Sequence, residues 1–170
     1  MTRPQYGTGK PPGNPHFEQK YSAGSKENKI PAILAEIRSK KNLAEISVED
    51  IAKENGIADS LANERNFRRD LKTTQLRKFF DTVVNNQERL KTSGWKSIES
   101  DFFMIRANLA YARGRGLIPQ DFFDLVSLCI ERIAPAGSSE KQIKDNYDRF
   151  VELLQALVAY TKYYGESRGA

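Results

Sequence analysis

The fold is decided by residues 119–133, which read PQDFFDLVSLCIERI. A proline opens this segment, and apolar residues then occupy nearly every side of a helix. A surface helix keeps a broad polar face, so a helix that is apolar almost all round belongs at the centre of a helical domain. Pro135-Ala-Gly137 stops the pattern. We therefore predict a central helix over residues 120–133.

Helices are also predicted on both sides of this segment. Apolar residues recur at helical spacing over 73–91 and again over 95–112. After the central helix, Ser139 and Gln142 have the spacing of a capping box, and a helical pattern continues to Gly165. Runs of alternating β-branched residues do not stand out. The sequence therefore predicts an all-α chain, folded as a compact bundle of about four to six helices.

Three segments of different character precede or form this bundle. Residues 1–29 are rich in Pro and Gly and poor in aliphatic residues, which predicts a disordered basic tail. Residues 30–71 read as short N-terminal helices, with Ser47 as an N-cap and Gly56 suited to a C-terminal cap. Residues 72–166 are predicted to form the helical bundle core domain.

The compartment is predicted from what the composition lacks. Cys129, the one cysteine, lies in an apolar run, which favours a buried and inert thiol in a reducing compartment. There is no apolar stretch near the ~18 residues that a membrane span needs, and the first residues lack the apolar core of a secretory signal. We expect a cytoplasmic protein with no membrane partner.

Positive charge is concentrated in the middle of the chain. The net charge is +5, from 27 basic and 22 acidic residues. Residues 72–118 hold nine basic and four acidic residues, whereas 30–71 and 119–170 are net negative. Arg106 and Arg113 lie seven apart on one predicted helix and so project from one side. Such a basic ridge suits a nucleic-acid backbone, although charged helix surfaces are often simply solvated.

Residues that build catalytic sites are scarce. The one histidine, His16, lies in the predicted tail, so with a single cysteine no zinc site of Cys and His can form. The carboxylate pairs Asp121 with Asp124 and Glu99 with Asp101 would suit Mg²⁺, but acids at helix N-termini commonly serve the helix dipole. We predict no enzyme activity, no catalytic or metal site and no cofactor.

An alternative function comes from residues 50–62, DIAKENGIADSLA. Small alanines, a turn glycine and a following helix resemble a helix-turn-helix core, which would suit a DNA-binding regulator. Asp59 and Glu64 are poor groups to face DNA. A helical protein-interaction module is the other alternative.

Three segments, in order, resemble the small subunit of the Csm complex, the type III-A CRISPR RNA-guided effector. They are LKTTQLRKFF at 71–80, LAYARGR at 109–115, and the closing helix with FVE at 150–152 and AYTKYY at 159–164. The resemblance covers about residues 70–165. Residues 1–70 look longer than the segment with which this family usually begins.

The resemblance implies a non-catalytic helical bundle whose copies stack head to tail along the effector filament. Its implied partners are the guide RNA, the target RNA, and the backbone and large subunits of the complex. Position by position, the implied RNA-binding residues are Lys72, Arg77, Lys78, Arg113, Arg115 and Lys162. Arg106 is added to this set because of its helical spacing from Arg113.

Overall fold

The computed structural model describes residues 28–166, and within this range every regular element is a helix. The all-α prediction is therefore confirmed, while the predicted tail lies outside the described residues except for Asn28 and Lys29. The elements are α1 (Ile30–Ser39), η1 (Leu43–Glu45), α2 (Val48–Ala52), α3 (Ile57–Asn63), α4 (Arg65–Asp70), α5 (Thr73–Ser93), η2 (Trp95–Ser97), α6 (Glu99–Gly114), α7 (Gln120–Ile133) and α8 (Glu140–Glu166).

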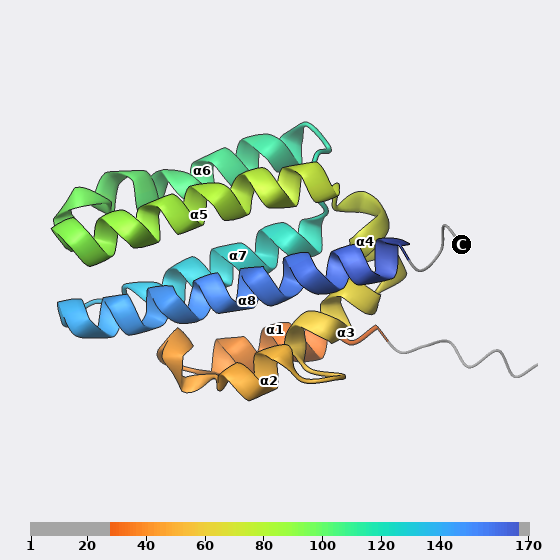
Figure 1. Cartoon of the computed structure of the whole chain (residues 1–170), viewed down its shortest axis with the longest axis horizontal. Helices are drawn as coiled ribbons and strands as arrows, with labels where there is room; N and C mark the ends of the chain where they lie inside the picture. Colours follow the sequence, from red (N-terminus) through yellow and green to blue (C-terminus); the bar gives the residue numbers. More distant parts are fainter. Residues whose placement is uncertain (1–27, 167–170) are drawn as a thin grey trace, which may run out of the picture.

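The four long helices α5 to α8 run alternately in opposite directions (Figure 1). As a result, α5 and α7 begin at the same end of the molecule at which α6 and α8 finish. The central position predicted for residues 120–133 is confirmed, because α7 buries Phe122, Leu125 to Ile130, and Ile133. The polar side of α7 is narrow and is formed mainly by its few acidic residues and Arg132.

The short N-terminal helices contribute to the hydrophobic core together with the long helices. α3, α2 and η1 pack against α8, and α1 packs against α7. Buried residues from Ile30 to Leu157 form one continuous hydrophobic cluster. The predicted domain boundary at residue 72 stays a prediction. Residues on both sides of it belong to this one cluster.

Local sequence explains how the N-terminal segment turns. Ser47 caps α2 as predicted, because its Oγ accepts a hydrogen bond of 2.9 Å from the backbone N–H of Asp50. The C-terminal cap predicted at Gly56 is wrong. Gly56 is the N-cap of α3, and the positive φ of 58° falls on Asn55. Glycine is still required at 56, because a Cβ there would lie 2.6 Å from the carbonyl oxygen of Asp50.

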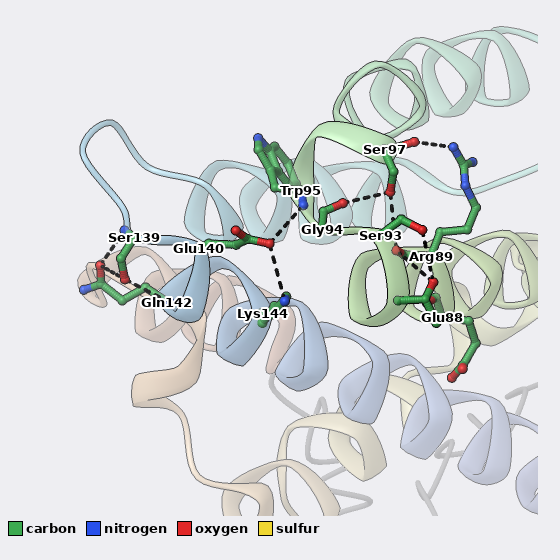
Figure 2. A network of polar contacts seen from close by, with 11 residues as sticks. Glu88, Arg89, Ser93, Gly94, Trp95, Ser97, Ser139, Glu140, Gln142 and Lys144 are labelled. Atoms are coloured by element: carbon green, nitrogen blue, oxygen red, sulfur yellow. Dashed lines mark hydrogen bonds and ion pairs between the residues drawn. The ribbon is translucent and has the colours of Figure 1, made fainter.

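A tight corner joins α5 to α6 and fixes it to the start of α8 (Figure 2). Gly94 has φ +78°, and a Cβ on it would lie 2.7 Å from Oε1 of Glu140. That oxygen accepts a hydrogen bond of 3.3 Å from the backbone N–H of Trp95 and pairs with Lys144 at 3.4 Å. The helix predicted to start near Trp95 therefore opens with η2, and α6 begins at Glu99.

The predicted capping box at the start of α8 is confirmed. Gln142 accepts a hydrogen bond of 2.9 Å from the backbone N–H of Ser139, and Ser139 Oγ accepts one of 3.3 Å from the N–H of Gln142 (Figure 2). Both ends of the α7–α8 connection are thus determined by residues visible in the sequence. None of the helices in the described range is long and apolar enough to cross a membrane.

Candidate nucleic-acid interface

Ion pairs divide the nine basic residues of segment 72–118 into two groups. Four of them pair with carboxylates: Arg89 with Asp101 (2.5 Å), Lys91 with Asp148 (3.8 Å), Lys96 with Glu99 (3.3 Å) and Arg106 with Glu131 (3.7 Å). Across residues 28–166, the other five make no ion pair with a carboxylate. These five are Lys72, Arg77, Lys78, Arg113 and Arg115, and we call them the basic end.

The basic end is one place in the molecule, although its residues are up to 43 apart in the sequence. Lys72 is the N-cap of α5, and Arg77 and Lys78 lie in the first two turns of that helix. Arg113 and Arg115 stand where α6 finishes. Because α5 and α6 are antiparallel, the start of one lies at the same end as the finish of the other (Figure 1). All five side chains are exposed.

Contacts show that these side chains fan out over several faces of that end. Arg113 is turned toward α7, since its Nε donates a hydrogen bond of 3.1 Å to Oε1 of Gln120. Arg115 lies over the ring of Tyr111, with its guanidinium carbon 5.6 Å from the ring centroid. Lys78 lines a cavity of about 190 Å³ between α5 and α6. These three cations therefore have different neighbours at this end of the bundle.

Two predicted residues stand apart from the basic end. Arg106 lies two turns from Arg113 on α6 and is ion-paired with Glu131 of α7, so part of its charge is already neutralised. Lys162 is exposed near the finish of α8, at the same end of the molecule as the basic end (Figure 1). The structure thus brings Lys162 to this end and leaves Arg106 along the side of the bundle.

The arginines of α4 were not predicted from the sequence. This short helix joins α3 to the start of α5 and carries Arg65, Arg68 and Arg69. Arg68 donates a hydrogen bond of 3.0 Å to the carbonyl of Ala62 and lies over the ring of Tyr164, whereas Arg69 pairs with Asp70 at 2.8 Å. The net charge counted over residues 30–71 hid this local cluster of arginines. A count over a shorter stretch of sequence would have found it.

Acidic residues mark one border of the basic end. Loss of hydration on burial raises the pKa of the Asp121 carboxyl above its usual range, and repulsion from Asp124 and then Glu64 raises it further. Asp121 and Asp124 lie in the first turns of α7, and Glu64 is near enough to affect the pKa of Asp121. Negative charge at this border would repel a polyanion.

Groups suited to catalysis do not converge in residues 28–166. No cluster of three His, Cys, Asp or Glu side chains there is arranged to hold a metal ion. Burial raises the pKa of the Cys129 thiol to about 12, so the nucleophilic thiolate is disfavoured at neutral pH. His16 lies outside the described residues.

The helix-turn-helix alternative lacks an exposed recognition helix. Six of the seven residues of α3, Ile57 to Ala62, are buried, and α3 packs against α8. A recognition helix must present side chains to the major groove, which a helix buried on all sides is unable to do.

Comparisons with known proteins agree on one family. The family model described as Csm2 Type III-A matches residues 48–167. The chain is also similar to a Streptococcus thermophilus protein named CRISPR system Cms protein Csm2, at 29% identity over 97 residues, which are 56% of this chain and 74% of the relative. No solved structure gives a significant match. The family match begins earlier than the resemblance seen in the sequence and takes in α2, α3 and α4. The chain therefore belongs to the Csm2 family of type III-A CRISPR systems, the small subunits of the Csm complex.

Proposed function

We propose that this chain is a non-catalytic structural subunit of a cytoplasmic type III-A CRISPR effector, and that its basic end lies against the backbone of a guide RNA–target RNA duplex. The observation that carries the proposal is the division of the basic residues. Within residues 72–118, the four cations outside this end are paired with carboxylates, whereas Lys72, Arg77, Lys78, Arg113 and Arg115 keep their charge available.

Unpaired cations at one end of a rigid bundle suit recognition of phosphates. Bringing them to a phosphate releases condensed counterions without breaking an internal ion pair. Double-stranded RNA in the A form offers its phosphates and 2′-hydroxyls, while its deep major groove hides the bases. Recognition of this kind follows duplex shape and charge and is indifferent to sequence. That suits a subunit whose target is chosen by the guide RNA.

The family resemblance supplies the remaining partners in the proposal. Copies of the subunit stack head to tail along the inner side of the filament, where they contact the backbone subunits and the large subunit. Lys162 joins the basic end in facing RNA, since the finish of α8 lies at that end. Arg106 contributes less, because Glu131 already pairs with it.

The test compares two charge-matched triple variants of the full chain. Arg77→Gln, Lys78→Gln and Arg115→Gln remove three cations from the basic end. Lys91→Gln, Lys96→Gln and Lys141→Gln remove three exposed cations at the opposite end of the bundle. Binding to a guide–target RNA duplex is measured across a series of salt concentrations, alone and after co-expression with the other complex subunits.

We expect the basic-end variant to lose RNA affinity and to reduce the slope of log affinity against log salt by about 2. The opposite-end variant should retain both, with circular dichroism unchanged in each. Equal losses in the two variants would mean that net charge alone matters and would overturn the basic end as the RNA site. Failure of the wild-type chain to co-purify with any complex subunit would overturn the structural-subunit role.

A further inference from the structure

A second group of cations lies at the end of the bundle opposite the basic end, where α7 finishes and α8 begins (Figure 1). Arg38 and Arg132 stand in the last turns of α1 and α7. Lys40 and Lys41 directly follow α1. These four residues, which we call the cationic corner, line one hollow of about 510 Å³ together with Ser138 and the first turn of α8.

The cationic corner keeps its charge, because none of its four side chains forms an ion pair with a carboxylate of residues 28–166. No acidic residue lines the hollow. Lys53 is the main cause that lowers the pKa of nearby Asp50, and Lys40 contributes least to that shift. The adjoining hollow beside Gly94 differs, since its lysines are paired: Lys91 with Asp148, Lys96 with Glu99 and Lys144 with Glu140.

Helix dipoles do not account for the whole corner. Arg38 and Arg132 stand where cations favour the dipoles of α1 and α7, but Lys41 lies beyond the C-cap of α1. The Arg132 guanidinium is only partly used. Its Nη2 donates a hydrogen bond of 3.1 Å to the carbonyl of Arg38, while its Nε is shielded from water and has no hydrogen-bond partner in the described residues. α8 has 27 residues and begins at this hollow, so the positive end of its dipole adds to the potential there.

From this arrangement we infer that the cationic corner binds a group of closely spaced phosphates. Four positive charges around one hollow are best matched by a ligand that carries several negative charges within a short length, as a chain of phosphates does. The guanidinium of arginine and the ammonium of lysine both donate charge-assisted hydrogen bonds to phosphate oxygens. No aromatic residue lines the hollow, so a base has nothing on which to stack. The ligand is recognised by its phosphates alone, and either a nucleic-acid backbone or a free polyphosphate supplies them.

Binding of inorganic tripolyphosphate to the full chain tests the corner apart from the basic end. The basic-end triple variant described above serves as the parent, and calorimetry at low salt should show binding to it. Adding Lys40→Gln and Lys41→Gln should weaken this binding about tenfold, because charge-assisted contacts are lost. The matched control adds Lys96→Gln and Lys141→Gln, two ion-paired lysines at the same end, and should leave the affinity unchanged.

Two results of this titration and one of a second measurement would overturn the inference. Absence of binding to the parent is the first, and equal losses in the two double variants are the second, because the ligand then responds to net charge alone. The second measurement locates the ligand by backbone amide resonances, and tripolyphosphate should shift those of residues 38–42 and 136–139. Shifts confined to residues 72–78 and 113–115 would place the ligand at the basic end instead.

Competition separates the two sources of phosphate from each other and from an acidic protein. If a short single-stranded RNA displaces tripolyphosphate from the parent, the corner takes a nucleic-acid backbone. If the RNA does not displace it, the corner takes a free polyphosphate. A glutamate peptide of the same net charge is the third competitor and should bind far more weakly. Equal affinity for the peptide and for tripolyphosphate would overturn the phosphate site and make the corner a contact for an acidic protein surface.

Discussion

Tyr164 fastens the last helix to the N-terminal helices through a single hydroxyl. Its O–H donates a hydrogen bond of 2.5 Å to Oδ1 of the buried Asp59. The other carboxylate oxygen accepts one of 2.6 Å from the backbone N–H of Asn55, the residue with positive φ. One carboxylate thereby holds the α2–α3 turn in place and connects it to α8.

This contact has a consequence at high pH. The hydrogen bond to Asp59 is the main cause that raises the pKa of Tyr164 to about 12, with burial second, from an ordinary value of about 10. Between these values the folded chain keeps a proton that the unfolded chain has lost, so the free energy of unfolding falls as pH rises. Tyr164→Phe should flatten this decline, measured by urea unfolding from neutral pH to about pH 12.

In the Tyr164→Phe variant the free energy of unfolding should still fall somewhat at high pH, because the pKa of Tyr147 is raised as well. Its hydroxyl donates to the carbonyl of Val83 at 3.2 Å, and burial also raises its pKa. Tyr163→Phe is a suitable control, because Tyr163 is 62% exposed on the same helix. An identical pH profile for Tyr164→Phe and Tyr163→Phe would show that the bond to Asp59 does not survive in solution.

At the scale of elements, Asn146 joins three of them. It lies on α8 and is only 1% exposed. Its Oδ1 accepts a hydrogen bond of 3.0 Å from the N–H of Ala44 in η1, and its Nδ2 donates one of 2.9 Å to the carbonyl of Ile133 at the finish of α7. One buried amide thus satisfies a backbone donor and a backbone acceptor from separate helices.

Asn146→Ala should therefore destabilise the chain more than removal of a surface amide. It leaves both backbone groups without a partner, at a cost of about 2–4 kcal/mol in the free energy of unfolding. Asn85→Ala, an exposed change on α5, should cost less than about 0.5 kcal/mol. Chemical denaturation of both variants measures the difference, and equal values would exclude this role for Asn146.

The same scale shows which elements the sequence could predict. Residues 120–133 and the Ser139–Gln142 box were readable because long apolar periodicity and reciprocal caps are local signals. The α2–α4 region was not readable from such local signals. Gly56 is required by the approach of the Asp50 carbonyl, and the place of α3 is determined by its packing on α8. The first contact depends on how the turn between α2 and α3 is folded, and the second joins residues far apart in sequence.

The candidate site likewise has features that the sequence predicts and features that only the structure shows. The concentration of cations in residues 72–118 was visible from composition. The sequence also showed that Arg113 and Arg115 stand close together at a helix end. Which of those cations are neutralised was not visible. Arg106 meets Glu131 only because α6 and α7 are neighbours. Ion pairing between helices is a tertiary property.

For the whole molecule, the shared core predicts that residues 72–166 are not stable alone. In the complete chain, α2, α3 and η1 cover α8, and α1 covers α7. A fragment of residues 72–166 would leave buried side chains such as Leu153 and Ile133 facing water. We expect a lower melting temperature than for residues 28–166 and strong binding of an apolar dye. Equal melting temperatures would establish the bundle as an independent domain.

The position of α8 after α1, α2 and α3 in the chain also sets the order of events during synthesis. The ribosome makes α1, α2 and α3 first, yet the helix on which α2 and α3 rest is the last of the described helices to emerge. Until then the apolar side chains of Ile51, Ile57 and Leu61 lack the surface that buries them. Burial of these side chains therefore waits until α8 has been made, and before that point the nascent chain is a natural client for chaperones that bind exposed apolar segments.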